Sequence, residues 1–397
     1  MAHAFHITAL LLGLLAALVT LPLCLELALA CLGRWFSSGR PAAAPLTGPL
    51  AVLIPAHNEE ALIARTVQSV LAAAEADPNP VNVTVIAHNC ADHTAARAAE
   101  AGARVLPIEG PAGKGRALRH GIEIALKEGA AAIAVIDADT QVSRNLLTVL
   151  RQSLAHADAA QAWYELGEPN LHGNTGQELG ALAFRGMNAV RPLGRDSAGF
   201  SSGLFGNGFA LRAETIAAVP WNAYGLAEDR EYHALLVLTG RRCAFAAEAR
   251  VWGVAAASRD ARRSQRLRWE GGRIALVRQM MAPLLRAALA GNLHALEVLL
   301  DALSLPFAFG LLMLLAALAL GLFMGAEWLL AYAIAGLALC LGYVVRSARL
   351  APHPGRAALA LLAAPWFVLR KLWLVPAMLR SASRKAAWVR TSREVKP

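Results

Sequence analysis

The stretch Ala132-Ile-Ala-Val-Ile-Asp-Ala-Asp139 decides how the centre of this chain folds. Its first five residues are apolar and have the length of a buried strand, and two carboxylates follow at once. Ligands of a parallel sheet bind at the carboxyl ends of its strands, so Asp137 and Asp139 would stand at a ligand site. Carboxylates suit Mg2+ or Mn2+, which commonly bridge to substrate phosphates. The stretch therefore predicts a metal and diphosphate site, with acids capping a turn as the alternative.

Short apolar runs alternate with helical patterns from about residue 50 to residue 270. Strands are predicted over residues 50–54 and 81–86, and helices over residues 59–76, 94–101 and 116–127. This alternation predicts an α/β fold with a mostly parallel sheet and helices on both of its faces. Candidate ligand-binding residues follow the first two strands: Pro55, His57, Glu59, His88 and Asn89.

The tripeptide Gly113-Lys114-Gly115 precedes the helix predicted over residues 116–127. Its glycines allow the backbone to approach a ligand closely, and Lys114 can meet a phosphate or a base near the helix N-terminus. A solvated turn explains the tripeptide equally well when it is taken alone. Its position between the second strand and the paired aspartates favours a role in binding.

An acidic pair, Glu228-Asp229, stands where another helix is predicted to begin. Acids stabilise a helix N-terminus, which is the structural interpretation of the pair. A carboxylate can also take the proton of an attacking hydroxyl as a general base. Asp229 is the candidate for that role, with Glu228 as the alternative.

The segment Gln265-Arg-Leu-Arg-Trp269 combines an amide, two guanidinium groups and an indole. On a helix, Gln265, Arg268 and Trp269 share one face through their i, i+3 and i+4 spacing. Arginine suits phosphate geometry, and an indole offers an apolar face to a sugar ring. The alternative is a basic amphipathic helix near a membrane, with Trp269 as its interfacial anchor.

The composition argues against a wholly soluble protein. Of the 397 residues, 56% are hydrophobic and only 17% are charged, and the mean hydropathy is +0.44. The net charge of +10 could indicate nucleic acid, but the basic residues are dispersed and cluster beside apolar segments. We therefore interpret them as the cytoplasmic flanks of membrane helices and expect no nucleic-acid partner.

Three apolar segments are predicted to cross the membrane, over residues 7–25, 303–324 and 328–345. A signal peptide is the alternative for the first, but basic residues follow this segment and none precedes it. The link between the last two lacks positive charge, whereas Arg346 and Arg349 follow the third. These asymmetries place the N-terminus outside and the central region in the cytoplasm, at the cell inner membrane.

These observations predict six parts along the chain. The parts are an N-terminal transmembrane helix (1–33), a cytoplasmic domain (48–273), an interfacial helical region (274–300), two transmembrane helices (301–346), an interfacial or re-entrant helix (357–380) and a basic cytoplasmic tail (381–397).

In their order along the chain, these motifs resemble those of the membrane-bound family-2 glycosyltransferases. This group contains cellulose, chitin and hyaluronan synthases and ceramide glucosyltransferase. The resemblance covers roughly residues 50–273, and the apolar helices that flank this region are also similar in kind to those of the family. It implies a cytoplasmic nucleotide-sugar-binding domain of the GT-A fold, inverting transfer from a nucleotide sugar, and Mg2+ or Mn2+ as the cofactor.

The resemblance also implies a role for each motif. Pro55-Ala-His-Asn-Glu59 resembles the P-x-x-N-E motif that lines the base, and Asp137 and Asp139 match the D-x-D motif that meets nucleotide and metal. Asp229 matches the catalytic base of the E-D motif. The resemblance further implies donor contacts from Gln265 and Arg268, and acceptor contacts from Gly206, Asn207 and Trp269. From their own positions in the sequence, Lys114 is added as a donor contact and Glu228 as an acceptor contact.

One position departs from the family pattern. Family members usually carry aspartate after the second strand, where it reads the nucleobase, whereas this chain has Ala87, His88 and Asn89. A histidine or asparagine can still hydrogen-bond to a base edge. A UDP-sugar remains the favoured donor.

The acceptor is left open between two classes. A polysaccharide acceptor is favoured because Q-x-x-R-W accompanies many processive family members, and a membrane lipid is the alternative. Three spans are few for a polysaccharide channel, so an export partner or a homo-oligomer would have to supply the rest. A non-catalytic nucleotide-sugar-binding subunit of a synthase is the non-enzymatic hypothesis.

Overall fold

The computed structural model describes residues 2–33, 44–167, 175–225, 227–254 and 259–366, with the side chains of all but residues 2–6 and 259–270. Its internal contacts divide the chain into two compact units. We call them the helical unit (Met1–Ser38, Gly173–Phe200 and Leu284–Val375) and the sheet unit (Gly39–His172, Ser201–Pro283 and Pro376–Pro397).

The sheet unit contains one eight-stranded mixed sheet. Its strands run in the order β3-β2-β1-β4-β7-β6-β8-β5, and four of its seven neighbouring pairs are parallel. The strands are β1 (Leu50–Ala56), β2 (Val81–His88), β3 (Arg104–Ile108), β4 (Ala132–Val135), β5 (Thr140–Val142), β6 (Ala159–Leu166), β7 (Phe209–Arg212) and β8 (Cys243–Gly253).

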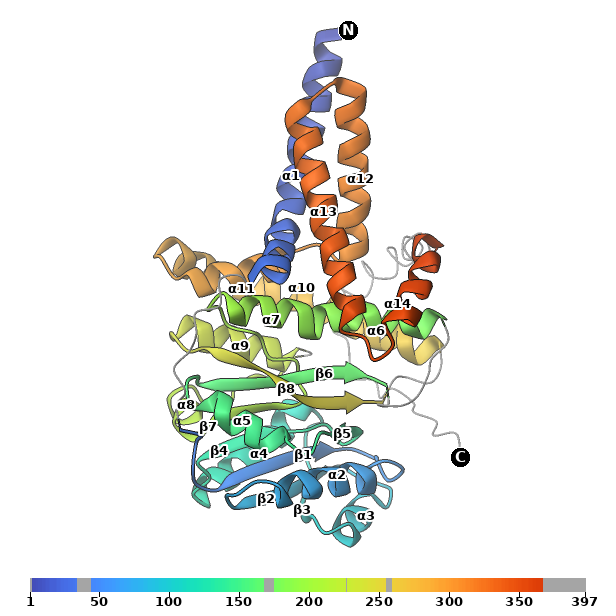
Figure 1. Cartoon of the computed structure of the whole chain (residues 1–397). Helices are drawn as coiled ribbons and strands as arrows, with labels where there is room; N and C mark the ends of the chain where they lie inside the picture. The colour runs from blue at the N-terminus through green and yellow to red at the C-terminus, as the bar shows by residue number, and fades with distance from the viewer. Residues whose placement is uncertain (1, 34–43, 168–174, 226, 255–258, 367–397) are drawn as a thin grey trace. The chain divides into compact units, whose positions relative to one another are not determined.

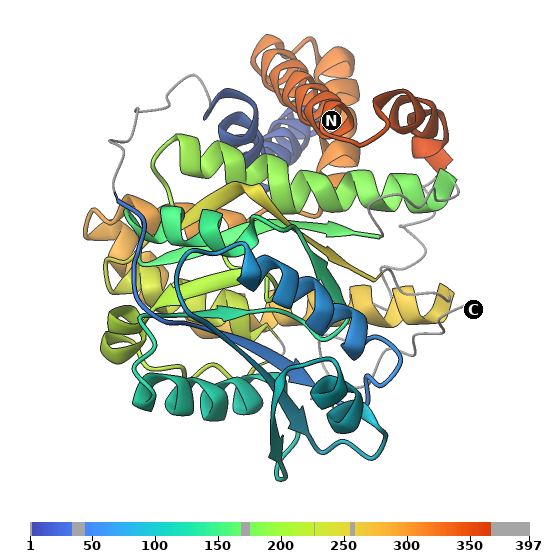
Figure 2. The same cartoon turned by 60° about the horizontal axis from the view of Figure 1, so that its bottom comes forward.

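Helices cover both faces of the sheet, which explains the continuous apolar runs of its central strands. Val52 and Ile54 of β1 point to the core beneath one set of helices, and Ala51 and Leu53 point to the opposite core. The first set, in front of the strands in Figure 2, is α2 (Ile63–Glu75), α3 (Thr94–Glu100) and α5 (Leu146–Leu154). The second set is α4 (Lys114–Lys127), α8 (Ala213–Ala218) and α9 (Glu228–Leu238).

The strand register brings three polar loops to one edge of the sheet. β1 pairs in parallel with β2 on one side, where Ala56 lies opposite Ala87. It pairs in parallel with β4 on the other side, where Leu53 lies opposite Val135. The chain therefore leaves all three strands at the same carboxyl edge, where a parallel sheet binds its ligands.

The predicted strands over residues 50–54, 81–86 and 132–136 are confirmed, and the first two extend two residues further. The helix predicted over residues 94–101 is confirmed as α3. Helix α2 begins only at Ile63, because residues before it form a turn braced by other loops. Helix α4 begins at Lys114, so this lysine is the first helical residue and does not lie in the preceding turn.

Among the described residues of the sheet unit, the most buried ion pair joins Arg151 of α5 to Asp77. The Arg151 Nε atom lies 3.0 Å from Asp77 Oδ1, and both side chains are almost fully buried. The guanidinium also donates to the backbone carbonyls of Leu46, Gly48 and Pro80. It therefore holds the segment before β1 and the segment before β2 to α5.

The helical unit comprises the apolar helices and one segment from the middle of the chain. Helices α1, α12 and α13 lie side by side (Figure 1). The elements are α1 (Ala2–Leu32), α6 (Thr175–Arg185), the π-helix η2 (Gly186–Val190), α7 (Arg191–Ser197), α11 (Leu293–Leu303), α12 (Phe307–Met324), α13 (Glu327–Arg349), α14 (Pro354–Ala360) and the 3-10 helix η3 (Leu361–Ala363).

Three helices of this unit are long and apolar enough to cross a membrane, as predicted: Ile7–Leu32, Phe307–Met324 and Glu327–Arg349. The first of these helices extends beyond the predicted end at residue 25. The second begins only after Pro306, since residue 303, where the predicted span began, is the last residue of α11. Other boundaries differ from the predicted parts. Residues 173–200 belong to the helical unit, and α10 (Arg259–Leu289) continues through residue 273. The tail over residues 381–397 and most of 357–380 lie outside the described residues.

A second buried charge cluster lies within the helical unit. The Arg195 guanidinium lies 2.5 Å from Glu26 Oε2, 2.5 Å from Glu297 Oε1 and 2.6 Å from Asp301 Oδ1. Arg191 adds a second cation, 3.3 Å from Asp301. Burial raises the pKa of Glu297 well above its ordinary value, while Arg195 opposes the rise. The two arginines thus offset buried acidic groups that would be costly without a partner.

We predict that Arg151→Met lowers the free energy of unfolding by about 3–5 kcal/mol, because it leaves Asp77 as an unpaired buried charge. The matched control is Arg104→Met, which breaks an exposed pair with Glu128 and should cost about 0–1 kcal/mol. Thermal or denaturant unfolding of the purified variants measures both values. Equal losses in the two variants would contradict the role given to Arg151.

Candidate active site

The D-x-D motif directly follows β4 and is bonded to a loop from much later in the chain. The backbone N–H of Asp137 donates to Asn207 Oδ1 over 3.0 Å, and Asn207 Nδ2 donates to Thr140 Oγ1 over 2.8 Å. Asn207 is fully buried, and Asp139 is nearly so. The side chain of Asn207 therefore fixes the backbone on both sides of the motif.

The same loop passes close to the acidic pair. Gly206 and Gly208 have φ angles of +73° and +71°, a region that favours glycine. A Cβ atom at Gly206 would lie 3.2 Å from Asp229 Oδ2, and one at Gly208 would lie 2.7 Å from a Val251 methyl group. The loop therefore needs glycine at both positions, and its backbone lies against the Asp229 carboxylate.

Lys114 joins the paired aspartates to this loop. Its Nζ atom lies 2.5 Å from Asp137 Oδ1 and donates a hydrogen bond to the backbone carbonyl of Gly206. About a quarter of the Lys114 side chain and a third of the Asp137 side chain remain exposed. Both charged groups are thus accessible to a ligand.

The charges of this cluster shift the pKa values of its members. Burial lowers the pKa of Lys114, but Asp137, Glu228 and Asp229 outweigh burial and leave it raised. Burial raises the pKa of Glu228 to about 7, although Lys114 opposes the rise. Burial likewise raises the pKa of Asp229, against the influence of Arg230. Lys114 is therefore charged, and the acidic pair holds protons more strongly than exposed carboxyls do.

Two hydrogen bonds hold α9, whose first turn carries the acidic pair as predicted. The Tyr232 hydroxyl donates to the carbonyl of Val219 over 2.6 Å. One turn after Asp229, His233 Nε2 lies 2.7 Å from Ser201 Oγ, and both side chains are buried. The position of Asp229 is therefore set by helix packing.

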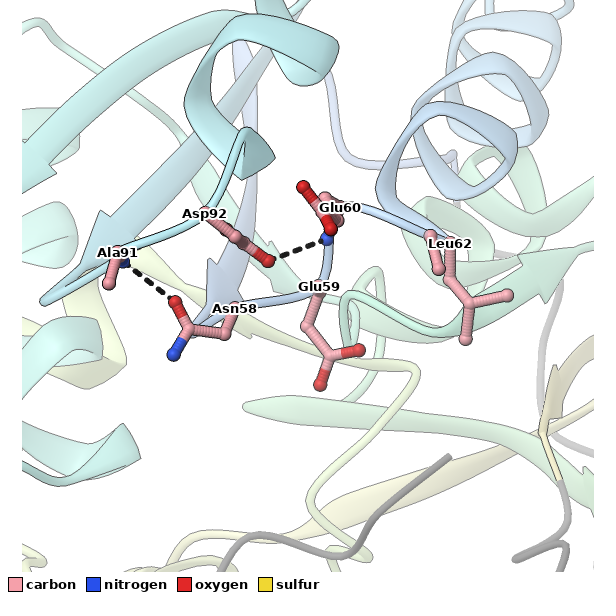
Figure 3. Close-up of a pocket in the computed structure, with 7 residues that line it drawn as sticks. Asn58, Glu59, Glu60, Leu62, Ala91 and Asp92 are labelled. Carbon is pink, nitrogen blue, oxygen red and sulfur yellow. Dashed lines mark hydrogen bonds between the residues drawn. The ribbon is translucent and has the colours of Figure 1, made fainter. Parts of the chain in front are cut away.

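The loop after β1 is braced against the loop after β2 (Figure 3). The Asn58 side chain accepts from the N–H of Ala91, and the Asp92 carboxylate accepts from the N–H of Glu60. Residues of both loops, among them Asn58, Glu59 and Asp92, line a polar cavity of about 380 Å3. The backbone N–H of Glu59 donates to Thr94 Oγ1. The acids of these loops thus serve in part to satisfy backbone groups.

The residues expected to contact a nucleobase differ in the hydrogen bonds that their side chains already make. His57 Nδ1 donates to the carbonyl of His88 over 2.8 Å, and His88 is buried at the end of β2. Burial lowers the pKa of His88, as do His57 and Arg116, so its imidazole is neutral near pH 7. The side-chain amide of Asn89, in contrast, bonds at both ends to the backbone of Gly110.

Four further predicted site residues lie in β1 or on α10 (Arg259–Leu289). Pro55 lies within β1, opposite Ile86 of β2. Gln265, Arg268 and Trp269 lie on α10 at spacings that share a helical face, but their side chains are outside the described residues. Their contacts with a ligand stay predictions.

Gln161 was not among the predicted residues, yet it supports the site. Its side-chain Nε2 donates to the carbonyl of Asn207 over 2.8 Å, and its Oε1 accepts from the N–H of Phe205 over 2.9 Å. The only signal in the sequence is one amide within the apolar strand β6. A buried polar side chain in such a run has to be satisfied by hydrogen bonds.

The described residues contain no group of three or more His, Cys, Asp or Glu side chains placed to hold a metal ion. Asp137 and Asp139 supply carboxylate oxygens, which hard divalent cations prefer. A cation here would therefore complete its coordination with water or with oxygens of a bound substrate, as Mg2+ commonly does with phosphates.

The sequence model of the family described as glycosyltransferase like family 2 matches residues 48–272. Among solved structures, the chain is similar to a mannosyltransferase from Pyrobaculum calidifontis in complex with GDP-Man and Mn2+. The identity is 17%, the TM-score is 0.51, and 94% of this chain and 97% of that chain are covered. A glucosyl-3-phosphoglycerate synthase from Mycobacterium tuberculosis, in complex with Mn2+, UDP and phosphoglyceric acid, matches at 22% identity and a TM-score of 0.36, over 50% of this chain and 67% of that chain. No curated protein sequence matches significantly.

We predict that Asn207→Ala lowers the free energy of unfolding by about 1–3 kcal/mol, because it leaves the Asp137 N–H without its partner. Asn82→Ala, at an exposed position of β2, is the matched control and should change stability by less than about 0.5 kcal/mol. Chemical denaturation of both variants measures the difference. A loss for Asn207→Ala no larger than that of the control would show that the bond does not hold the motif.

Proposed function

The chain belongs to the glycosyltransferase-like family 2, and we propose that it is a membrane-bound inverting glycosyltransferase. It would move a sugar from a nucleotide sugar to a hydroxyl group of an acceptor. The observation that carries this proposal is the meeting of Asp137, Lys114 and Asp229 around Gly206 at the carboxyl edge of the sheet. This arrangement supports a role of Asp137 and Lys114 in binding the donor next to Asp229 as the base.

Asp229 is the proposed general base. Its carboxylate takes the proton of the acceptor hydroxyl while that oxygen forms a bond to the anomeric carbon of the donor sugar. The bond between this carbon and the diphosphate breaks, and the nucleoside diphosphate leaves. Burial raises the pKa of Asp229, which makes its carboxylate a stronger base than an exposed aspartate.

Asp137 and Asp139 are the proposed holders of Mg2+ or Mn2+. Their carboxylate oxygens fit the preference of these cations, and diphosphate oxygens would complete the shell. When bound, the cation supplies positive charge against the charge that develops on the leaving diphosphate. Lys114 adds a second positive charge from the chain itself, and Gln265 and Arg268 are the proposed further contacts to the diphosphate.

For the donor base we propose His57 and His88 as contacts, and a UDP-sugar as the donor class. The His88 imidazole is neutral, so it can both donate and accept at a base edge. Asn89 is a weaker candidate than we expected, since its amide already bonds to Gly110. A panel of UDP-, GDP- and dTDP-sugars tests the choice of donor.

For the acceptor we propose a polysaccharide, with Glu228, Asn207 and Trp269 near its growing end. The alternative is a membrane lipid, and the two classes are distinguished by the product. A polysaccharide product remains in the aqueous phase and grows in length, whereas a glycolipid extracts into organic solvent. Product partition after incubation with a labelled donor therefore decides between them.

We propose that three helices anchor the protein in the cell inner membrane, with the catalytic domain in the cytoplasm. Their length and mean hydropathy support the anchoring. Arg346 and Arg349 in the last turn of α13 support the orientation, because positive charge is retained on the cytoplasmic side. The uncharged α12 C-cap at Gly325 would then lie outside.

We predict that Asp229→Asn lowers transfer by about 10²–10⁴-fold, the usual contribution of a general base. Donor binding should be retained, because the amide keeps the shape of the carboxylate. Turnover with a labelled nucleotide sugar and calorimetric binding of the nucleotide measure the two effects. Glu123→Gln, an exposed acid on α4, is the control and should leave turnover unchanged. Full turnover in Asp229→Asn would exclude Asp229 as the base.

We predict that the transfer rate falls on acidification, because only the ionised Asp229 accepts a proton. The acid limb of the rate profile should lie above the ordinary aspartate value of 3.8, since burial raises the pKa of Asp229. Initial rates with a labelled nucleotide sugar over a series of buffers measure this limb. A rate that stays constant down to the ordinary pKa of an aspartate contradicts the role given to Asp229.

A further inference from the structure

Lys114 occupies a position that the proposed function does not fully use. Its ammonium lies 2.5 Å from Asp137 Oδ1, and Asp137 is one of the two carboxylates proposed to hold the cation. The same ammonium is anchored to the carbonyl of Gly206, beside Asp229. The D-x-D motif is therefore paired with a positive charge that belongs to the chain.

We propose that Lys114 is the resident counter-ion of the D-x-D motif and competes with the divalent cation for Asp137 until a donor is bound. This inference rests on the proposed function. In this inference Lys114 has two roles: it contacts a phosphate of the donor, and it controls when the metal binds Asp137.

The competition follows from the charges. An ammonium and a divalent cation on one carboxylate repel each other, and the ammonium already neutralises the charge that attracts the metal. Among the described residues, Lys114 is the cation that forms an ion pair with Asp137. A metal ion that arrives without a donor must therefore displace the ammonium or bind beside it at a cost.

A diphosphate removes this conflict. It brings two or more negative charges and several oxygens, enough for the metal and the ammonium to bind different oxygens. Lys114 is suited to such a transfer because it begins α4, where an anion is favoured, and because its flexible side chain is partly exposed. Metal and donor should therefore bind with positive coupling, each tightening the other by the same factor.

A structural salt bridge is the competing explanation, and it makes a different prediction. If the pair only holds α4 to the loop after β4, then loss of the lysine lowers stability and leaves metal affinity unchanged or weaker. If Lys114 competes with the metal, its removal strengthens metal binding in the absence of donor. The sign of the change in metal affinity separates the two.

The test is Mn2+ binding to the purified full-length protein, measured by calorimetry or by the resonance signal of free Mn2+, with and without UDP or GDP. Without nucleotide, Lys114→Met should bind Mn2+ about tenfold or more tightly than the wild type does. It should also lose most of the coupling between Mn2+ binding and nucleotide binding. Lys114→Gln, which keeps a donor for Gly206, should change in the same direction and guards against misfolding of the first variant. Lys114→Arg should resemble the wild type.

Lys127→Met is the matched control, since it removes the same charge from the exposed last turn of the same helix and should leave Mn2+ affinity unchanged. Unchanged or weaker Mn2+ binding in both Lys114→Met and Lys114→Gln, with thermal unfolding showing folded protein, overturns the inference alone. Failure of the wild type to bind Mn2+ even with every nucleotide diphosphate overturns the proposed metal-dependent function, and the inference with it.

Discussion

The candidate site depends on the hydrogen bonds of one buried side chain, that of Asn207. Its amide accepts from the N–H of Asp137 and donates to Thr140, so the D-x-D backbone and the later loop are held as one unit. Gln161 supports the loop from beneath through the Asn207 carbonyl. Because Gly206 precedes Asn207, the same bonds bring Asp229 and Lys114 beside the motif. A polar side chain satisfied at both ends can specify such an arrangement in a way that an apolar contact cannot.

The site also has to solve an electrostatic problem. Asp137, Glu228 and Asp229 lie close together, and the pKa values of the acidic pair rise because burial disfavours their charge. Lys114 opposes the rise at Glu228, and Arg230 and Lys114 oppose it at Asp229, while the pKa of Lys114 itself is raised. A base needs a high pKa and yet has to be ionised in order to act. Burial favours the first condition, and the two neighbouring cations favour the second.

Local patterns in the sequence were enough to predict the first part of the sheet. The strands before Ala56, His88 and Asp137 were recognised because buried parallel strands are apolar throughout. The helix that begins at Glu228 was recognised from acids in its first turn. Strands β3 and β5–β8 were not predicted, since they are short, are exposed in part or carry polar residues. Contacts across the fold, such as Asn207 to Asp137 or Asn89 to Gly110, depend on tertiary packing and have no local pattern. The inclusion of residues 173–200 in the helical unit has the same cause.

Two charge clusters among the described residues, one in each unit, show how the choice of cation fits the task. In the helical unit, Arg195 contacts three carboxyl groups at once through its planar, multidentate guanidinium. Moving it would break several ion pairs together, so that cluster is suited to holding helices in place. In the sheet unit, Lys114 makes one ion pair and one backbone hydrogen bond through a single flexible ammonium. Those two contacts can be exchanged for phosphate oxygens at little cost, so a lysine there can hold the site together and still release its carboxylate to a ligand.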